Sequence, residues 1–245
     1  MKIVIPSYRR PDNCLTAKLL RRAVIAVHKN EIEEYRKHNQ NEILEMPDEL
    51  AEKGMAVIRN WILDNAGDEE ILMIDDDIKY FLYFERSERK KMDEEMIYEL
   101  AENGFRMARE CGTKLWGINV APDKIFYKEC SPFALTSPVC GTFFGAIRDP
   151  EIRFDERLGL KEDYDYSIQI LKKYRKIWRF NKYFYQAEHI NSTGGCSGYR
   201  SFDREKEQAE LLQKKWGKKI VRINRKGQHG HISINPIVKV PIKGI

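Results

Sequence analysis

Residues 70–77 read EILMIDDD, an apolar run that ends in three consecutive carboxylates, Asp75, Asp76 and Asp77. A short apolar run of this kind predicts a buried strand over residues 70–74. In open α/β sheets, ligands bind outside the carboxyl ends of the strands. The three aspartates are therefore predicted to lie at a ligand site.

The chemistry of adjacent aspartates indicates which ligand to expect. Carboxylates in a partly desolvated site repel one another unless a cation neutralises them. Because side chains alternate along a strand, Asp75 and Asp77 are predicted to point to one side and Asp76 to the other. Such an Asp-X-Asp pair can hold Mg²⁺ or Mn²⁺, and the metal can neutralise a diphosphate leaving group. The alternative is a solvated turn or a helix N-cap.

Strand-like and helix-like segments alternate on both sides of this run. Further strands are predicted at residues 2–5, 23–27, 42–46, 114–120 and 139–147, and KYFYQAEH at residues 182–189 is also strand-like. Helices are predicted at residues 14–22, 31–38, 51–66, 93–111, 164–174 and 204–216. A charged linker is expected near residues 85–91, and loops around residue 194 and from residue 217 onward. The alternation predicts an α/β fold with an open mixed sheet, mostly parallel, flanked by helices.

Length and composition limit the class of protein. A chain of 245 residues with 42% hydrophobic and 11% aromatic residues has enough apolar material for one folded core. It contains no run near the roughly 20 apolar residues that a membrane span needs, and it starts without a signal-peptide pattern. We expect a cytosolic protein, without a zinc site or disulfide framework, because its five cysteines lack CxxC spacing.

Charge is distributed unevenly along the chain. Residues 1–160 carry 24 Lys and Arg against 30 Asp and Glu, whereas residues 161–245 carry 19 against 8, a net charge of +11. This basic third predicts a polyanionic partner, with an ordinary solvated surface as the alternative. Basic residues interleave with Tyr174 and Trp178, which indicates phosphate contacts beside stacking surfaces. Core packing is the alternative for the two aromatic residues.

A second acidic constellation, FDERLGLKEDYD, covers residues 154–165. Glu162 and Asp163 are predicted near the start of a helix, where the helix dipole stabilises carboxylates. A carboxylate in this position can take the proton of an acceptor hydroxyl group. Acidic residues there can also serve only as helix caps.

Five motifs in order resemble those of the family 2 glycosyltransferases, which adopt the nucleotide-sugar-binding GT-A fold. The motifs are IPSYRR at residues 5–10, Arg59-Asn60, the three aspartates, GTFFG at residues 141–145, and FDE at residues 154–156 leading to EDYD at residues 162–165. The resemblance spans roughly residues 1–190, which implies a nucleotide-sugar-binding and catalytic domain. Residues 191–245 are then expected to form a basic C-terminal extension packed on the same domain.

The resemblance implies roles for individual residues. Those expected to line the nucleotide site are Pro6, Ser7, Tyr8, Arg10, Arg59, Asp75 and Asp76. Asp77 would be the chief metal ligand, assisted by Asp75. A histidine late in the chain, His229 or His231, is a further candidate metal ligand. His189 is a candidate for contact with the diphosphate. Asp163 would be the catalytic base of an inverting transfer, with Glu162 as a neighbour that adjusts its charge or contacts the acceptor.

The sequence departs from the family pattern after the second strand. The usual acidic uracil-binding segment is replaced by His28-Lys29-Asn30-Glu31. A UDP-sugar remains the expected donor, but because of this departure the sequence does not identify the base of the donor nucleotide.

More narrowly, RNW at residues 59–61 and MIDDDI at residues 73–78 resemble the TET-associated glycosyltransferases of phages. This resemblance implies that the acceptor is a 5-hydroxymethylated pyrimidine in DNA and that the protein works in the cytoplasm of a host cell. A protein, lipid or polysaccharide acceptor is the alternative within this class. A metal-dependent nuclease or phosphatase, or a DNA-binding protein without turnover, are alternatives outside it. The oligomeric state stays open.

Overall fold

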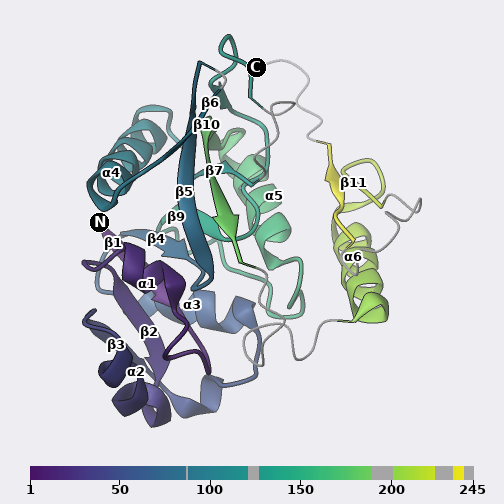
Figure 1. The fold of residues 1–245 in the computed structure, drawn as a ribbon. Coiled ribbons are helices and arrows are strands. Elements are labelled where there is room, and N and C mark those ends of the chain that lie inside the picture. Colours follow the sequence, from purple (N-terminus) through teal and green to yellow (C-terminus); the bar gives the residue numbers. More distant parts are fainter. Residues whose placement is uncertain (87, 121–126, 189–200, 224–233, 240–245) are drawn as a thin grey trace.

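The computed structural model describes residues 1–86, 88–120, 127–188, 201–223 and 234–239. Within these residues, ten strands form one sheet in the order β3-β2-β1-β4-β9-β7-β10-β5-β6, with β8 paired to β10 beside this path (Figure 1). The strands are β1 (Lys2–Pro6), β2 (Val24–His28), β3 (Ile43–Met46), β4 (Glu70–Ile74), β5 (Ile78–Glu85), β6 (Glu88–Lys91), β7 (Leu115–Asn119), β8 (Phe133–Ala134), β9 (Phe143–Ile147) and β10 (Trp178–Ala187).

The sheet is mixed, and its parallel part lies on the N-terminal side. Strands β3, β2, β1 and β4 pair in parallel, as do β7 and β10. Strand β9 runs antiparallel to both β4 and β7, and β5 runs antiparallel to β10. The predicted α/β fold with an open mixed sheet flanked by helices is confirmed.

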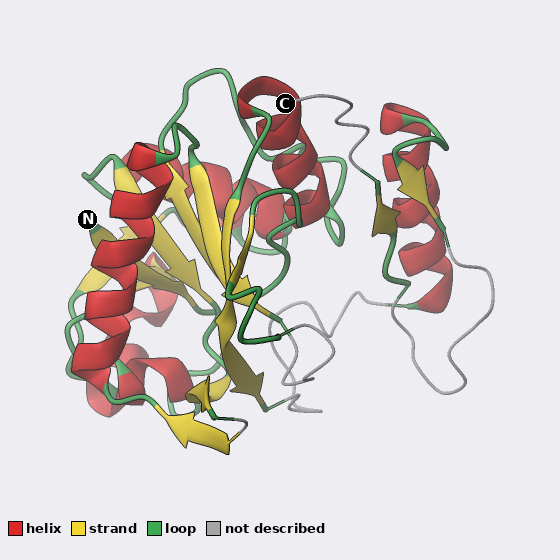
Figure 2. Cartoon of the chain, turned by 90° about the horizontal axis from the view of Figure 1, so that it is seen from above, coloured by secondary structure: helices red, strands yellow, loops and turns green. Residues whose placement is uncertain are grey.

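Six α-helices accompany the sheet within the described residues, and five of them cover its two faces (Figure 2). They are α1 (Leu15–Leu19), α2 (Ile32–His38), α3 (Met55–Asn65), α4 (Glu94–Glu110), α5 (Glu162–Tyr174) and α6 (Phe202–Trp216). Alternate residues of β1 face opposite ways, so that Ile3 and Ile5 pack with α1, α2 and α4, whereas Val4 packs with α3 and α5. The result is a sheet buried on both sides. None of the helices in the described part of the chain is long and apolar enough to cross a membrane.

Two sequence predictions were wrong. Residues 85–91 do not form a linker, because β5 and β6 pair as a hairpin in which Phe81 and Phe84 are buried. The charged residues of β6 are all exposed, as expected of an edge strand that avoids further pairing. The segment after residue 217 is not all loop either, because β11 (Val221–Arg222) pairs with β12 (Ile237–Val238).

Smaller differences concern the ends of elements. Strand β9 starts at Phe143 rather than residue 139, and α3 starts at Met55 because Gly54, with φ of 96°, ends the preceding turn. Helix α6 and the two short strands lie to one side of the sheet (Figure 1). A small apolar cluster that includes Leu158, Ile168, Leu212 and Val221 joins them to the loop before α5 and to α5 itself.

Candidate functional site

The three aspartates form a tight turn between β4 and β5, named here the Asp turn (residues 75–77). The hydroxyl group of Thr16, in α1, donates to the carbonyl of Asp75 at 2.6 Å, and the N–H of Thr16 donates to the carbonyl of Asp76 at 3.1 Å. On the other side, the N–H of Asp75 donates to the carbonyl of Thr142 at 3.0 Å. These bonds fix the backbone and leave the three carboxylates to other partners.

Asp76 is the buried member of the Asp turn. Its carboxylate accepts a hydrogen bond from the Ser7 hydroxyl at 2.5 Å and one from the Arg10 guanidinium at 3.0 Å. The Tyr35 hydroxyl completes the group, 2.7 Å from the Ser7 hydroxyl, and it accepts the N–H of Arg10 at 3.1 Å. Asp76, a predicted nucleotide-site residue, therefore fixes the loop that follows β1, and Pro6 lies at the start of that loop.

Asp75 and Asp77 have weaker charge compensation. The Asp75 side chain is 36% exposed, and its nearest cation is the Arg59 guanidinium at 3.6 Å. Burial raises the pKa of Asp77 to about 7, and the negative charges of Asp75 and Asp76 add to this effect. The Asp turn therefore carries negative charge that the described residues neutralise only in part.

A divalent cation fits the Asp turn on the chemistry of these two side chains. Mg²⁺ and Mn²⁺ prefer carboxylate oxygens, and a cation would remove the repulsion that raises the pKa of Asp77. The described residues contain no group of three His, Cys, Asp or Glu side chains that could hold a metal. Asp75 and Asp77 are the described side chains that would hold such an ion. His189, His229 and His231, the other predicted contacts, lie outside the described residues.

Arg59 connects the Asp turn to the start of α5, named here the helix start (residues 161–165). Arg59 lies in α3 and is only 4% exposed. Its guanidinium is 3.3 Å from the Glu162 carboxylate and 3.6 Å from that of Asp75. Burial raises the pKa of Glu162 to about 7, although the positive charge of Arg59 opposes this rise.

Asp163 is held by backbone groups at the same place. Its carboxylate accepts the N–H of Gly141 at 2.6 Å and the N–H of Tyr164 at 2.7 Å. Gly141 has φ of 81°, a left-handed conformation that glycine adopts at little cost. The loop before β9 thus fixes the orientation of Asp163 and also, through Thr142, holds the Asp turn.

Tyr185 is a site residue that sequence reasoning missed. It lies near the end of β10 and forms a hydrogen bond with Thr142. Besides burial, the negative charges of Asp75 and Asp163 are close enough to raise the pKa of its hydroxyl group. Burial raises its pKa to about 12, so that its hydroxyl stays protonated and can donate a hydrogen bond. The sequence predicted a strand here, but no feature separated Tyr185 from the other tyrosines of that strand.

Tyr8 lies on the outer side of the loop after β1. Its ring meets the His28 ring edge to face at 5.5 Å, and its hydroxyl donates to Glu52 at 3.3 Å. Glu31, within the segment that departs from the family pattern, accepts the N–H of Arg9 at 3.0 Å. An acidic side chain, that of Glu31, therefore contacts the loop after β1.

The basic third is partly engaged within the protein. Lys173 pairs with Asp149 at 2.6 Å, and Lys215 pairs with Asp155 at 2.8 Å. Trp178 is 6% exposed and lies in the core, so the packing alternative is the correct one for this residue.

A model of the TET-associated glycosyltransferase family matches residues 1–195. Among solved structures, the chain is similar to residues 1–349 of TarS from S. aureus in complex with UDP-GlcNAc, with a TM-score of 0.51 and 17% identity, covering 86% of this chain and 65% of that one. TarS residues 1–349 without that ligand give a TM-score of 0.49 and 14% identity, covering 87% and 66%. At this identity, the first of these similarities shows the GT-A-like fold alone.

A nucleotide-diphospho-sugar transferase described as putative, from Desulfovibrio desulfuricans G20, gives a TM-score of 0.43 and 8% identity, covering 87% of this chain and 98% of that one. The chain spans slightly less than two thirds of the TarS 1–349 chains. No protein with a curated description matches it.

Proposed function

The chain belongs to the TET-associated glycosyltransferase family, and we propose that it transfers a sugar from a UDP-sugar, with inversion, to the hydroxyl group of a 5-hydroxymethylated pyrimidine in DNA. One observation carries the proposal: Arg59 contacts both Asp75 of the Asp turn and Glu162 of the helix start. The carboxylates that would hold a metal ion against the donor diphosphate therefore lie beside the helix start, where Asp163 would deprotonate the acceptor.

The proposed reaction uses these positions as follows. Asp163 takes the proton of the acceptor hydroxyl group as its oxygen bonds to the anomeric carbon from the side opposite the diphosphate. The bond between that carbon and the diphosphate oxygen breaks, and UDP leaves with the electron pair. Gly141 keeps the Asp163 carboxylate in one orientation during this step. Arg59 is buried between the Asp turn and the helix start and sets the distance between them.

A divalent cation held by Asp75 and Asp77 would neutralise the charge that builds up on the departing diphosphate. The loop after β1 would bind the nucleotide, with Ser7 and Arg10 fixed by Asp76 and with Tyr8 on its outer side. Such a fixed loop lowers the entropy lost when the donor binds.

Two observations support the finer features of the proposal. TarS residues 1–349, whose fold this chain shares, were solved in complex with UDP-GlcNAc, which supports a uridine donor. The net charge of +11 over residues 161–245 supports a polyanionic acceptor such as DNA. Lys172, Lys214 and Arg222 are exposed and have no carboxylate partner within the described residues.

The test incubates the protein with Mn²⁺, a labelled UDP-sugar pool, and DNA containing 5-hydroxymethylcytosine, 5-hydroxymethyluracil or neither. We expect label on one of the hydroxymethylated DNAs, together with release of UDP. Label that appears equally on unmodified DNA, or only on protein, lipid or polysaccharide acceptors, refutes the DNA acceptor and retains the transferase. Cleavage of the DNA without release of UDP would indicate a nuclease.

A further inference from the structure

Helix α6 is connected to the helix start by an ion pair that solvent does not reach. The Lys161 ammonium donates to the Glu205 carboxylate at 2.6 Å, and the two side chains are 3% and 0% exposed. The same carboxylate oxygen accepts the N–H of Ile234 at 3.0 Å. Glu205 therefore ties the residue before Glu162 to two parts of the C-terminal segment.

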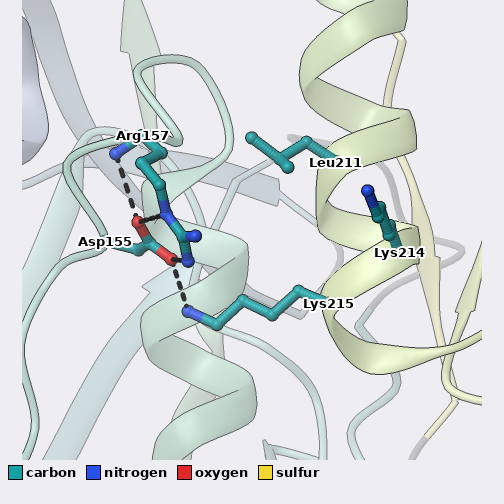
Figure 3. Close-up of a pocket in the computed structure, with 5 residues that line it drawn as sticks. All are labelled: Asp155, Arg157, Leu211, Lys214 and Lys215. Carbon is teal, nitrogen blue, oxygen red and sulfur yellow. Dashed lines mark hydrogen bonds and ion pairs between the residues drawn. The ribbon is translucent and has the colours of Figure 1, made fainter.

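A second buried contact lies one helical turn further along α5. Asp165 is fully buried and accepts hydrogen bonds from the Lys215 ammonium at 2.9 Å and from the Trp216 indole at 2.7 Å. Lys215 also reaches Asp155, which Arg157 holds from the other side (Figure 3). The space between this loop and α6 is a cavity of about 280 Å³, lined by Asp155, Arg157, Leu211, Lys214 and Lys215.

Helix geometry relates these contacts to the candidate base. Successive residues of an α-helix are about 100° apart around its axis, so residues four apart share a face. Lys161, the N-cap of α5, and Asp165 both contact α6, and Asp163, about 200° from Asp165 around the axis, faces the opposite way, toward Gly141. Two ties on one face fix the rotation of the first turn of α5 and, with it, the direction of the Asp163 carboxylate.

We propose that Lys161, Glu205 and Asp165 are positioning residues, through which α6 holds the helix start in the rotation that aims Asp163 at the acceptor hydroxyl group. This inference rests on the proposed transfer reaction. The partners Glu205, Lys215 and Trp216 lie beyond residue 195, where the family match ends. The C-terminal segment is thus part of the catalytic apparatus of this chain as well as a basic surface.

The test separates positioning from stability by removing both charges of the pair. The double variant Lys161→Met/Glu205→Met removes both charges of the pair together and fills the space with apolar side chains, a replacement that usually keeps or raises stability, while the N–H of Ile234 loses this acceptor. Transfer from the labelled UDP-sugar pool to DNA containing 5-hydroxymethylcytosine or 5-hydroxymethyluracil is measured per donor-binding site. The number of sites and the donor affinity are taken from calorimetry with the UDP-sugar that the unaltered protein uses. We expect transfer per site to fall about tenfold or more with donor affinity unchanged.

A second variant keeps the inference testable if the double variant does not fold. Glu205→Asp keeps both charges and shortens the reach by one methylene, and we expect it also to lower transfer per site. Two single variants serve as controls: Glu207→Gln changes an exposed charge of α6, and Lys173→Met breaks an ion pair at the far end of α5. Both controls should transfer at the rate of the unaltered protein.

Wild-type transfer per site in either folded variant overturns the inference, because a purely structural role would be satisfied by a stable fold. Loss of donor affinity in step with transfer also overturns it. The unaltered protein is run in the same assay. If it transfers no sugar, the proposed function fails, whereas failure of the positioning role requires an active unaltered protein.

Discussion

The Asp turn and the helix start each gather three carboxylates, yet the protein compensates their charges in different ways. At the helix start, Glu162 faces Arg59, Asp163 accepts two backbone N–H groups, and Asp165 accepts from Lys215 and Trp216. In the Asp turn, Asp76 has comparable partners in Ser7 and Arg10, whereas the nearest cation to Asp75 among the described residues is Arg59, at 3.6 Å.

This difference indicates different chemical tasks. A carboxylate with fixed hydrogen bonds keeps one direction, which suits proton transfer to and from a positioned group. Crowded carboxylates whose charge is compensated only in part suit an ion that arrives with the substrate. The comparison therefore predicts that changes at the helix start affect the rate of transfer and the stability of the fold, whereas changes at the Asp turn affect donor binding.

The largest effect is expected at Asp163. In Asp163→Asn the side chain keeps its size but cannot take the proton, so transfer should fall by roughly 100- to 10,000-fold, the usual range for a general base. Donor affinity should stay near that of the unaltered protein. Steady-state transfer and calorimetric titration of the donor measure the two quantities. Transfer near the wild-type rate would show that Asp163 is only a helix cap.

Asp165→Asn should have the largest effect on stability. Asp165 is fully buried, and its carboxylate accepts from Lys215, Trp216 and Gln169. Removing one partner of a buried charge network costs about 3–5 kcal/mol. Urea unfolding monitored by circular dichroism measures the loss. Asp203→Asn, an exposed position of α6, is the control and should change the free energy of unfolding by less than about 0.5 kcal/mol.

Asp77→Asn should act on donor binding and leave the fold intact. We expect it to abolish the gain in donor affinity that Mn²⁺ gives, a loss of about tenfold or more, which corresponds to about 1.4 kcal/mol. Asp75→Asn should have a smaller effect in the same direction. Titration of UDP-glucose with and without Mn²⁺ tests both, and an unchanged Mn²⁺ dependence in Asp77→Asn would refute the assignment of the metal.

The same residue predicts a pH dependence of stability. The folded pKa of Asp77, about 7, lies above its ordinary value of 3.8, so the folded protein binds this proton more tightly than the unfolded chain. Stability without metal should therefore fall as pH rises from about 4 to about 7. Glu162, with a raised pKa of its own, contributes in the same direction. The slope should become shallower in Asp77→Asn, and thermal melts across this pH range measure it.

These two clusters also show what the sequence can and cannot predict. Both were found because consecutive carboxylates follow a strand or begin a helix, which are local patterns. Much of the order of strands and helices was predictable for the same reason, since β1 and β4 are short apolar runs and α4 and α5 repeat apolar residues at helical spacing. The hairpin of β5 and β6 was missed because charged residues dominate the sequence of residues 85–91, although Phe81 and Phe84 of the same hairpin are buried.

Contacts between distant segments could not be predicted. Tyr185 reaches the site only because β10 ends beside the Asp turn, where the N–H of Glu188 donates to the carbonyl of Asp77 at 2.9 Å. Glu205 looks like an ordinary surface residue of an amphipathic helix until α6 packs against Lys161. Sequence periodicity gives the face of a helix but not the partner of that face.

A smaller effect on transfer is expected at Tyr185. Its hydroxyl group lies near Asp75 and Asp163, where it can donate to the donor diphosphate or to the acceptor. In Tyr185→Phe one such neutral hydrogen bond is lost, which corresponds to about 0.5–1.5 kcal/mol, or up to roughly tenfold in transfer. Tyr183→Phe, on the same strand and away from the carboxylates, is the matched control. Equal rates in the two variants would remove Tyr185 from the site.

The smallest effect concerns the salt dependence of DNA binding. Lys172, Lys214 and Arg222 are three of the exposed basic residues in the C-terminal third that have no carboxylate partner within the described residues, whereas Lys173 and Lys215 are engaged by Asp149, Asp155 and Asp165. Each phosphate contact contributes about −0.9 to the slope of log affinity against log salt on duplex DNA, so three contacts give a slope near −3. Lys214→Gln should reduce its magnitude by about 0.9, and Lys37→Gln, on α2, should leave it unchanged. Fluorescence anisotropy at several salt concentrations measures this slope. A slope that is the same in Lys214→Gln and in the unaltered protein would place the DNA on another surface and leave the contrast between the two carboxylate clusters intact.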